Sequence, residues 1–227
     1  MIRHPHIVFD LDGTLVDSLP GISQAINLAL ISLNLPTHPP TAIRAMIGRG
    51  ARELCAKALG AQHSNDADAD LLHRMEQAFA HAYAQTLAGD GTRVFPGVLS
   101  MISNLSANGA HLAILSNKPQ EPTTRIVKAL FHAQPFTHVF GFEKGRFERK
   151  PSPETLHFIA REWGVDIADI ILVGDSIHDA KTAENAGCQL ALVAWGYSSM
   201  EPLLTWREQH PCQLLGTIED LNRFLLK

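Results

Sequence analysis

The sequence predicts an α/β fold in which a mainly parallel sheet is interrupted by an inserted helical domain. Short apolar, β-prone runs alternate with helical patterns after Gly91, which is typical of a parallel sheet covered by helices on both faces. An isolated strand-like run at 7–9 precedes a long, purely helical block. Because a lone strand cannot satisfy its own backbone groups, this run is expected to pair with the later strands in a Rossmann-like core.

Each element follows from a local pattern. Apolar residues at helical spacing, helix-starting prolines and pattern-breaking glycines predict the helices of the inserted block. They are expected at 22–33, from 39–41, at 51–59 and at 72–83. Apolar runs of three or four residues predict the strands. They are expected at 7–9, 112–115, 138–140, 170–173 and 190–193.

These patterns define the expected domain organisation. Residues 1–15 and 93–227 are expected to form the Rossmann-like core, and residues 16–92 the helical insertion. The sequence shows no internal repeat and no low-complexity segment.

Composition excludes several classes of protein. The 227 residues carry 23 acidic and 19 basic side chains, a formal charge of −4, so we expect neither nucleic-acid binding nor attraction to an anionic membrane. No apolar run approaches the length of a membrane span, and the first residues do not match an export signal. The three cysteines lie far apart without metal-ligand spacing, and the histidines show no paired ligand spacing, so we expect a cytoplasmic protein without disulfides or a zinc site.

Polar clusters follow three of the predicted strands, and a fourth cluster, at Lys150, precedes the helix that leads to the strand at 170–173. Ligands bind beyond the carboxyl ends of the strands in open α/β sheets, so these clusters are expected to converge. In chain order they are Asp10-Leu11-Asp12-Gly13-Thr14, Ser116-Asn117-Lys118, Lys150-Pro151-Ser152-Pro153 and Gly174-Asp175-Ser176-Ile177-His178-Asp179. Carboxylates, a hydroxyl and a lysine around one point suit a phosphate group and a hard cation.

These four motifs, in this order, resemble those of the haloacid dehalogenase-like hydrolases. The helical block between the first and second motifs is similar to the cap domain of the phosphoglycolate-phosphatase-like branch, and the resemblance covers nearly the whole chain. Any one motif has a structural explanation, such as a turn, a helix cap or a solvated lysine, but the order and strand placement of all four favour the functional interpretation.

The resemblance implies catalytic roles. Asp10 would attack phosphorus to form an aspartyl-phosphate, and Asp12 would protonate the leaving alkoxide and then deprotonate the attacking water. Alternate residues of an extended segment share a side, which lets both carboxylates face one substrate. Ser116 would hold a phosphoryl oxygen, and Lys150 would pair with Asp10 and the phosphate.

The resemblance also implies a Mg²⁺ cofactor. Carboxylates beside a phosphate need a cation, and an all-oxygen donor set favours Mg²⁺. Asp175 and one oxygen of Asp10 would bind the metal together with the backbone carbonyl of Asp12, and Asp179 would orient the metal shell.

Three further residues are expected to bind substrate. Thr14 can hydrogen-bond a neighbouring carboxylate or the phosphate, and Asn117 follows the phosphate-binding serine. Arg49 lies between Gly48 and Gly50, a stretch that lacks the spacing and the preceding strand of a dinucleotide-binding motif. As part of a cap loop, Arg49 would reach the substrate's carboxylate or phosphate, whereas the alternative is a solvated arginine between two helices.

We therefore expect Mg²⁺-dependent hydrolysis of a small phosphorylated metabolite, most like that of phosphoglycolate phosphatase, by a monomer or homodimer. Two alternatives stay open at this stage. A hexose-phosphate mutase of the same fold keeps both motif carboxylates, and a phosphoacceptor module binds Mg²⁺ and accepts phosphate on an aspartate without turnover. Asp12, placed to activate water, favours hydrolysis over the phosphoacceptor module.

Overall fold

The computed structural model describes residues 2–60, 66–86, 91–132 and 135–227 and divides the chain into two compact units. Unit 1 comprises Met1–Val16 and Val94–Lys227, and unit 2 comprises Asp17–Arg93. Among the described residues, no helix is both long and apolar enough to cross a bilayer.

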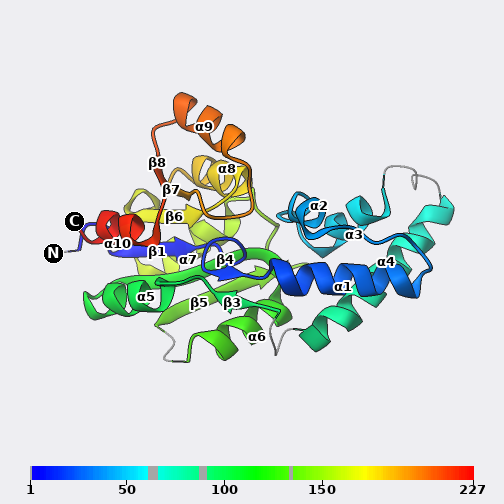
Figure 1. The fold of residues 1–227 in the computed structure, drawn as a ribbon. Helices are drawn as coiled ribbons and strands as arrows, with labels where there is room; N and C mark the ends of the chain where they lie inside the picture. Colours follow the sequence, from blue (N-terminus) through cyan, green and yellow to red (C-terminus); the bar gives the residue numbers. More distant parts are fainter. Residues whose placement is uncertain (1, 61–65, 87–90, 133–134) are drawn as a thin grey trace. The chain divides into compact units, whose positions relative to one another are not determined.

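Unit 1 is built on a six-stranded sheet whose strands all run parallel to their neighbours (Figure 1). Its spatial order is β5 (Phe136–Phe142), β4 (His111–Pro119), β1 (His6–Phe9), β6 (Ile170–Gly174), β7 (Gln189–Val193) and β8 (Gln213–Leu215). The sheet confirms the predicted α/β fold class and pairs the first strand with the later ones. The strand β4 is longer than predicted, so the second polar cluster lies within its last residues and does not follow it.

Helices cover both faces of the sheet and bury its central strands. Val8, Ala113 and Leu172 belong to one cluster with side chains of α7 (Glu154–Trp163) and α8 (Ile177–Ala186). The alternate residues, such as Ile7 and Phe9, are fully buried and point to the opposite face.

The remaining helices of unit 1 complete the layers. They are α5 (Val98–Ala107), α6 (Gln120–Leu130), α9 (Met200–Gln209), α10 (Ile218–Leu226) and the short 3₁₀ helix η1 (Ile167–Asp169). The helices α5 and α10 contact each other, α6 packs on β4 and β5, and α9 packs on α8 and β8.

Unit 2 is helical, with α1 (Leu19–Ser32), α2 (Pro40–Arg44), α3 (Ala51–Leu59) and α4 (Asp66–Thr86). The helix α4 packs on α1 and α3, and α2 packs on α1. Two short strands, β2 (Val16–Asp17) and β3 (Arg93–Val94), form a separate sheet at the two points where the chain passes between the units. Nearby in unit 2, the Gly21 N–H donates to the Gly91 carbonyl at 2.7 Å.

Candidate active site

The first motif forms a tight turn directly after β1. The N–H groups of Thr14, Leu15 and Val16 all donate to the Leu11 carbonyl at 3.0 to 3.3 Å. Gly13 has φ +84°, and a Cβ placed there would lie 2.6 Å from an oxygen of Asp175, so the turn needs a residue without a side chain. This turn brings Asp10 and Asp12 to the carboxyl end of the sheet.

Asp10 is held by Lys150. The two side chains are buried, and the Lys150 Nζ lies 2.9 Å from Asp10 Oδ1 and 2.5 Å from Asp179 Oδ1. The Leu11 N–H also donates to Asp10 Oδ1, at 2.7 Å, which fixes the direction of the carboxylate. Lys150 therefore links the first and fourth motifs, as the sequence interpretation requires of a lysine that pairs with Asp10.

The fourth motif begins where β6 ends. The Tyr197 N–H donates to Asp175 Oδ2 at 2.6 Å. Asp179 lies in the first turn of α8, where its Oδ2 accepts hydrogen bonds from the Ser176 N–H at 3.1 Å and the Ser176 hydroxyl at 2.6 Å. With Lys150 on Oδ1, both Asp179 oxygens have protein partners, so this side chain fits an orienting role better than direct coordination of a metal.

Burial and like charge perturb this cluster. Burial raises the pKa of Asp10 well above its usual range, opposed by Lys150 and reinforced by the Asp179 and Asp175 carboxylates. Burial also raises the pKa of Asp175 to about 7, with Asp179 adding to the effect. Although burial lowers it, the pKa of the Lys150 ammonium is raised by Asp10 and Asp179.

The residues fit a divalent cation. Oxygens of Asp10, Asp175 and Asp179 all lie within 4.8 Å of one another, and the donor set contains no sulfur or nitrogen. Asp10, Asp12, Asp175 and Asp179 face the two ammonium groups of Lys118 and Lys150, a formal excess of two negative charges. A hard dication balances that charge, and buried carboxylates are its usual ligands.

The second motif connects the others through hydrogen bonds. The Lys150 N–H donates to Asn117 Oδ1 at 2.8 Å, and Asn117 Nδ2 donates to the Lys150 carbonyl at 3.1 Å. The Asn117 amide, expected to bind substrate, is thus engaged with the Lys150 backbone. Ser116 is buried, and its Oγ accepts the Lys118 N–H at 3.2 Å.

Lys118 is a site residue that the sequence interpretation left without a role. Its Nζ lies 3.1 Å from Asp12 Oδ1 and 2.9 Å from Asp12 Oδ2. The sequence analysis also missed Gly196. This residue belongs to the site because a Cβ at its position would collide with Asp175. Gly196 and Tyr197 follow the predicted strand at 190–193, so the rule that found the other clusters could have found them.

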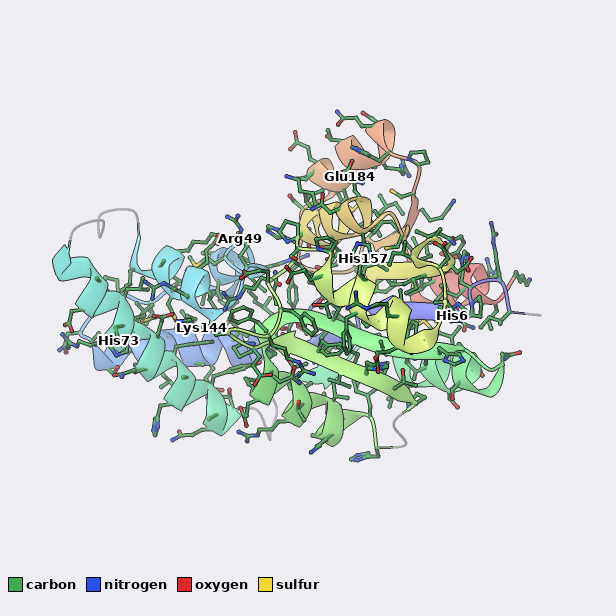
Figure 2. All side chains as sticks on the ribbon, turned by 180° about the vertical axis from the view of Figure 1, so that it is seen from behind. His6, Arg49, His73, Lys144, His157 and Glu184 are labelled. Atoms are coloured by element: carbon green, nitrogen blue, oxygen red, sulfur yellow. The ribbon has the colours of Figure 1, made fainter. Side chains whose placement is uncertain are left out.

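Two expected substrate-binding residues differ in their surroundings. Thr14 is almost fully buried, and its Oγ1 has no hydrogen-bond partner among the described residues, although the sequence predicted one on a neighbouring carboxylate or the phosphate. Arg49 belongs to unit 2, in the loop before α3 (Figure 2). Its side chain is 56% exposed and forms an ion pair with Glu53 at 3.1 Å.

Comparison with known proteins defines the family of this chain. The family model described as haloacid dehalogenase-like hydrolase matches residues 7–193, and the chain belongs to this family.

The relatives then define the branch. The chain is 36% identical over 196 residues to a phosphoglycolate phosphatase of Rhodospirillum rubrum, covering 85% of this chain and 80% of the relative. It is 33% identical over 218 residues to that of Yersinia pseudotuberculosis, covering 95% and 90%. The structure of a predicted phosphoglycolate phosphatase from Haemophilus somnus superimposes with a TM-score of 0.86 at 28% identity, covering 99% of each chain. The chain is a phosphatase of the phosphoglycolate-phosphatase-like branch.

Proposed function

We propose that this phosphatase hydrolyses a small phosphate monoester in two displacements, with Asp10 as the nucleophile. The carrying observation is the buried Asp10 carboxylate, fixed by Lys150 beside two further carboxylates at the carboxyl end of a parallel sheet. In the first displacement the Asp10–phosphorus bond forms and the ester bond breaks. In the second, water attacks phosphorus and regenerates the Asp10 carboxylate.

Asp12 is proposed as the proton carrier for both steps. It gives a proton to the leaving ester oxygen and later takes one from the attacking water. One carboxyl group can serve twice because the two oxygens occupy the same side of phosphorus in successive steps. The turn after β1 holds Asp12 two residues beyond Asp10, which supports this assignment.

Ser116, Thr14 and Lys150 are proposed to position the phosphoryl group. The Ser116 Oγ accepts one hydrogen bond, which leaves its own hydrogen to donate to a phosphoryl oxygen. The unpartnered Thr14 Oγ1 can do the same or bind a water of the metal shell. The Lys150 ammonium balances the charge that builds on the transferred group.

Mg²⁺ is the proposed cofactor. Asp175, one oxygen of Asp10 and the Asp12 carbonyl would hold it, and Asp179 would orient this shell. When bound, the ion offsets the charge of the phosphoryl oxygens and of the carboxylates around them. The all-carboxylate cluster supports Mg²⁺ over zinc, since zinc prefers imidazole and thiolate ligands. The three free cysteines are consistent with a reducing compartment such as the cytoplasm.

Phosphoglycolate is the proposed substrate, because the relatives in two genera carry that activity in their names. Its carboxylate gives Arg49 a proposed partner, with the two flanking glycines at φ +124° and +92° allowing the loop its conformation. Glu53, the present partner of Arg49, is half-buried, but Arg49 itself is exposed, so their ion pair is weak and Glu53 competes little with a bound carboxylate.

Phosphate release from a panel of small esters, with Mg²⁺ and then with EDTA, tests the proposal. Phosphoglycolate should exceed bulky phosphosugars in kcat/KM, and EDTA should abolish the reaction. Movement of phosphate within a hexose phosphate, without release, would instead indicate a mutase. Phosphorylation in a single stoichiometric event, without turnover, would indicate a phosphoacceptor module.

A further inference from the structure

Asp12 and Lys118 form a buried ion pair that joins the first and second motifs across 106 residues of sequence. The Lys118 side chain is 6% exposed and that of Asp12 is 12% exposed. One ammonium lies within hydrogen-bond distance of both Asp12 oxygens, at 2.9 and 3.1 Å. This arrangement fixes the rotation of the carboxylate about its Cβ–Cγ bond.

The lysine is itself held at its base. Lys118 lies near the end of β4, which pairs with β1 up to Phe9 and Ile114, so the two strands deliver their last residues to the same edge. The Lys118 N–H donates to Ser116 Oγ, which ties the backbone of Lys118 to the serine proposed to bind phosphate. The ammonium therefore extends from a rigid strand to a turn whose own backbone is hydrogen-bonded.

The two lysines of the site form ion pairs with different carboxylates. Lys150 contacts Asp10 and Asp179, whereas Lys118 contacts Asp12. The nucleophile and the proton carrier are thus oriented by different ammonium groups, from different motifs. The orientation of Asp12 matters because its carboxyl group must lie within hydrogen-bond distance of the leaving ester oxygen and of the attacking water. Neither of these oxygens is covalently attached to the protein.

We propose that Lys118 is a positioning residue that acts through Asp12, an inference that rests on the proposed function. In the first displacement a proton passes from the Asp12 carboxyl to the ester oxygen as that oxygen leaves phosphorus. In the second, a water proton passes to Asp12 as the water oxygen bonds to phosphorus and the Asp10–phosphorus bond breaks. Lys118 keeps the Asp12 carboxyl group directed at the oxygen that leaves phosphorus in the first step and at the water oxygen in the second. It does not itself bind the phosphoryl group.

Leaving-group dependence tests this role. An aryl phosphate expels a stable phenolate and needs no proton in the first step, whereas an alkyl phosphate such as phosphoglycolate does. Lys118→Met should lower kcat/KM for phosphoglycolate by about 30- to 100-fold and that for p-nitrophenyl phosphate by less than about 5-fold. With the aryl ester, rapid mixing should show a burst of one nitrophenol per enzyme followed by slow turnover, because the second step still needs Asp12.

Three further variants make the comparison specific. Lys118→Arg keeps a cation and should recover at least about one decade of the phosphoglycolate activity. In an Asp12→Asn background, Lys118→Met should cost less than about 2-fold, because the carboxylate that it directs is gone. Lys128 is an exposed lysine on α6, and Lys128→Met should have the wild-type kcat/KM for both esters. Should Lys118→Met fail to fold, Lys118→Gln carries the same comparisons.

Two results would overturn the role of Lys118. One is an equal loss for both esters without a burst, which indicates phosphate binding or general disruption. The other is a full further loss in the Asp12→Asn background. A wild-type protein that hydrolyses neither ester refutes the proposed function itself and is recognised before any variant is made.

Discussion

Replacing Asn117 with alanine separates two roles for its side chain. The sequence suggests substrate binding, whereas the structure places both amide groups on the Lys150 backbone at 2.8 and 3.1 Å. Asn117→Ala removes two buried hydrogen bonds and leaves a buried N–H and a buried carbonyl without that partner. Each orphaned group costs about 1–3 kcal/mol, so we expect the two together to lower the free energy of unfolding by about 2–6 kcal/mol.

Thermal unfolding followed by circular dichroism measures this loss. For a chain of this length it corresponds to a fall of about 4–24 °C in the melting temperature. The kcat value should fall with it, because Lys150 loses the contact that sets its backbone. Asn108→Ala is the matched control, since Asn108 is exposed and its Nδ2 donates a hydrogen bond to the Asn104 carbonyl at 2.8 Å. It should change the melting temperature by less than about 2 °C.

An unchanged melting temperature with a raised KM would refute this reasoning. That result would mean that the amide turns toward the ligand and that Lys150 keeps its position without it.

The remaining predictions concern the nucleophile, the metal, the turn and the loop of unit 2. Asp10→Asn should lower phosphate release by more than about 10³-fold in a folded protein, and substantial remaining activity would contradict covalent catalysis. EDTA should abolish activity and Mg²⁺ restore it, and calorimetry should detect no Mg²⁺ binding to Asp175→Ala; full activity in chelator would exclude the metal. Gly13→Ala should lower the free energy of unfolding by more than Gly109→Ala does. Gly109 has φ +85°, but a Cβ there would meet no atom within 4 Å, so its replacement should cost only about 1–2 kcal/mol. Equal losses would show that Asp175 does not constrain the turn. Arg49→Ala should lower kcat/KM about one to two decades for phosphoglycolate and far less for an aryl phosphate, and equal effects would remove Arg49 from carboxylate recognition.

The central strands were predictable because burial on both faces makes them continuous apolar runs. Residues 7–9 and 170–173 have this pattern, and both are fully buried or nearly so. The edge strand β8 was not predicted, since it has three residues and lies half-buried, which leaves no clear alternation. The strands β2 and β3 have two residues each, too few for any periodicity.

The site was predictable as a set of strand ends, but not as a network of contacts. The parallel strands β1 and β6 bring Asp10 and Asp175 to one region, the loop before α7 adds Lys150, and the sequence order of the motifs was enough to group them. The partners of Asn117 and Lys118 lie 33 and 106 residues away, and nothing in the local spacing says which carboxylate or backbone group each side chain reaches. The contact of Lys118 with Asp12 depends on the register of β4 against β1, and that of Asn117 on the path of the loop before α7, and only the folded chain provides these.

The paired strands β2 and β3 have a consequence for how this protein can evolve. The two ends of residues 17–93 meet in one strand pair, closed further by the ion pair of Asp17 with Arg93 at 3.1 Å. Exchange or resizing of a segment whose ends already touch adds no gap to the rest of the chain. The acidic cluster and both lysines belong entirely to unit 1, so exchange of residues 17–93 would leave the proposed catalytic residues in place while changing the other unit.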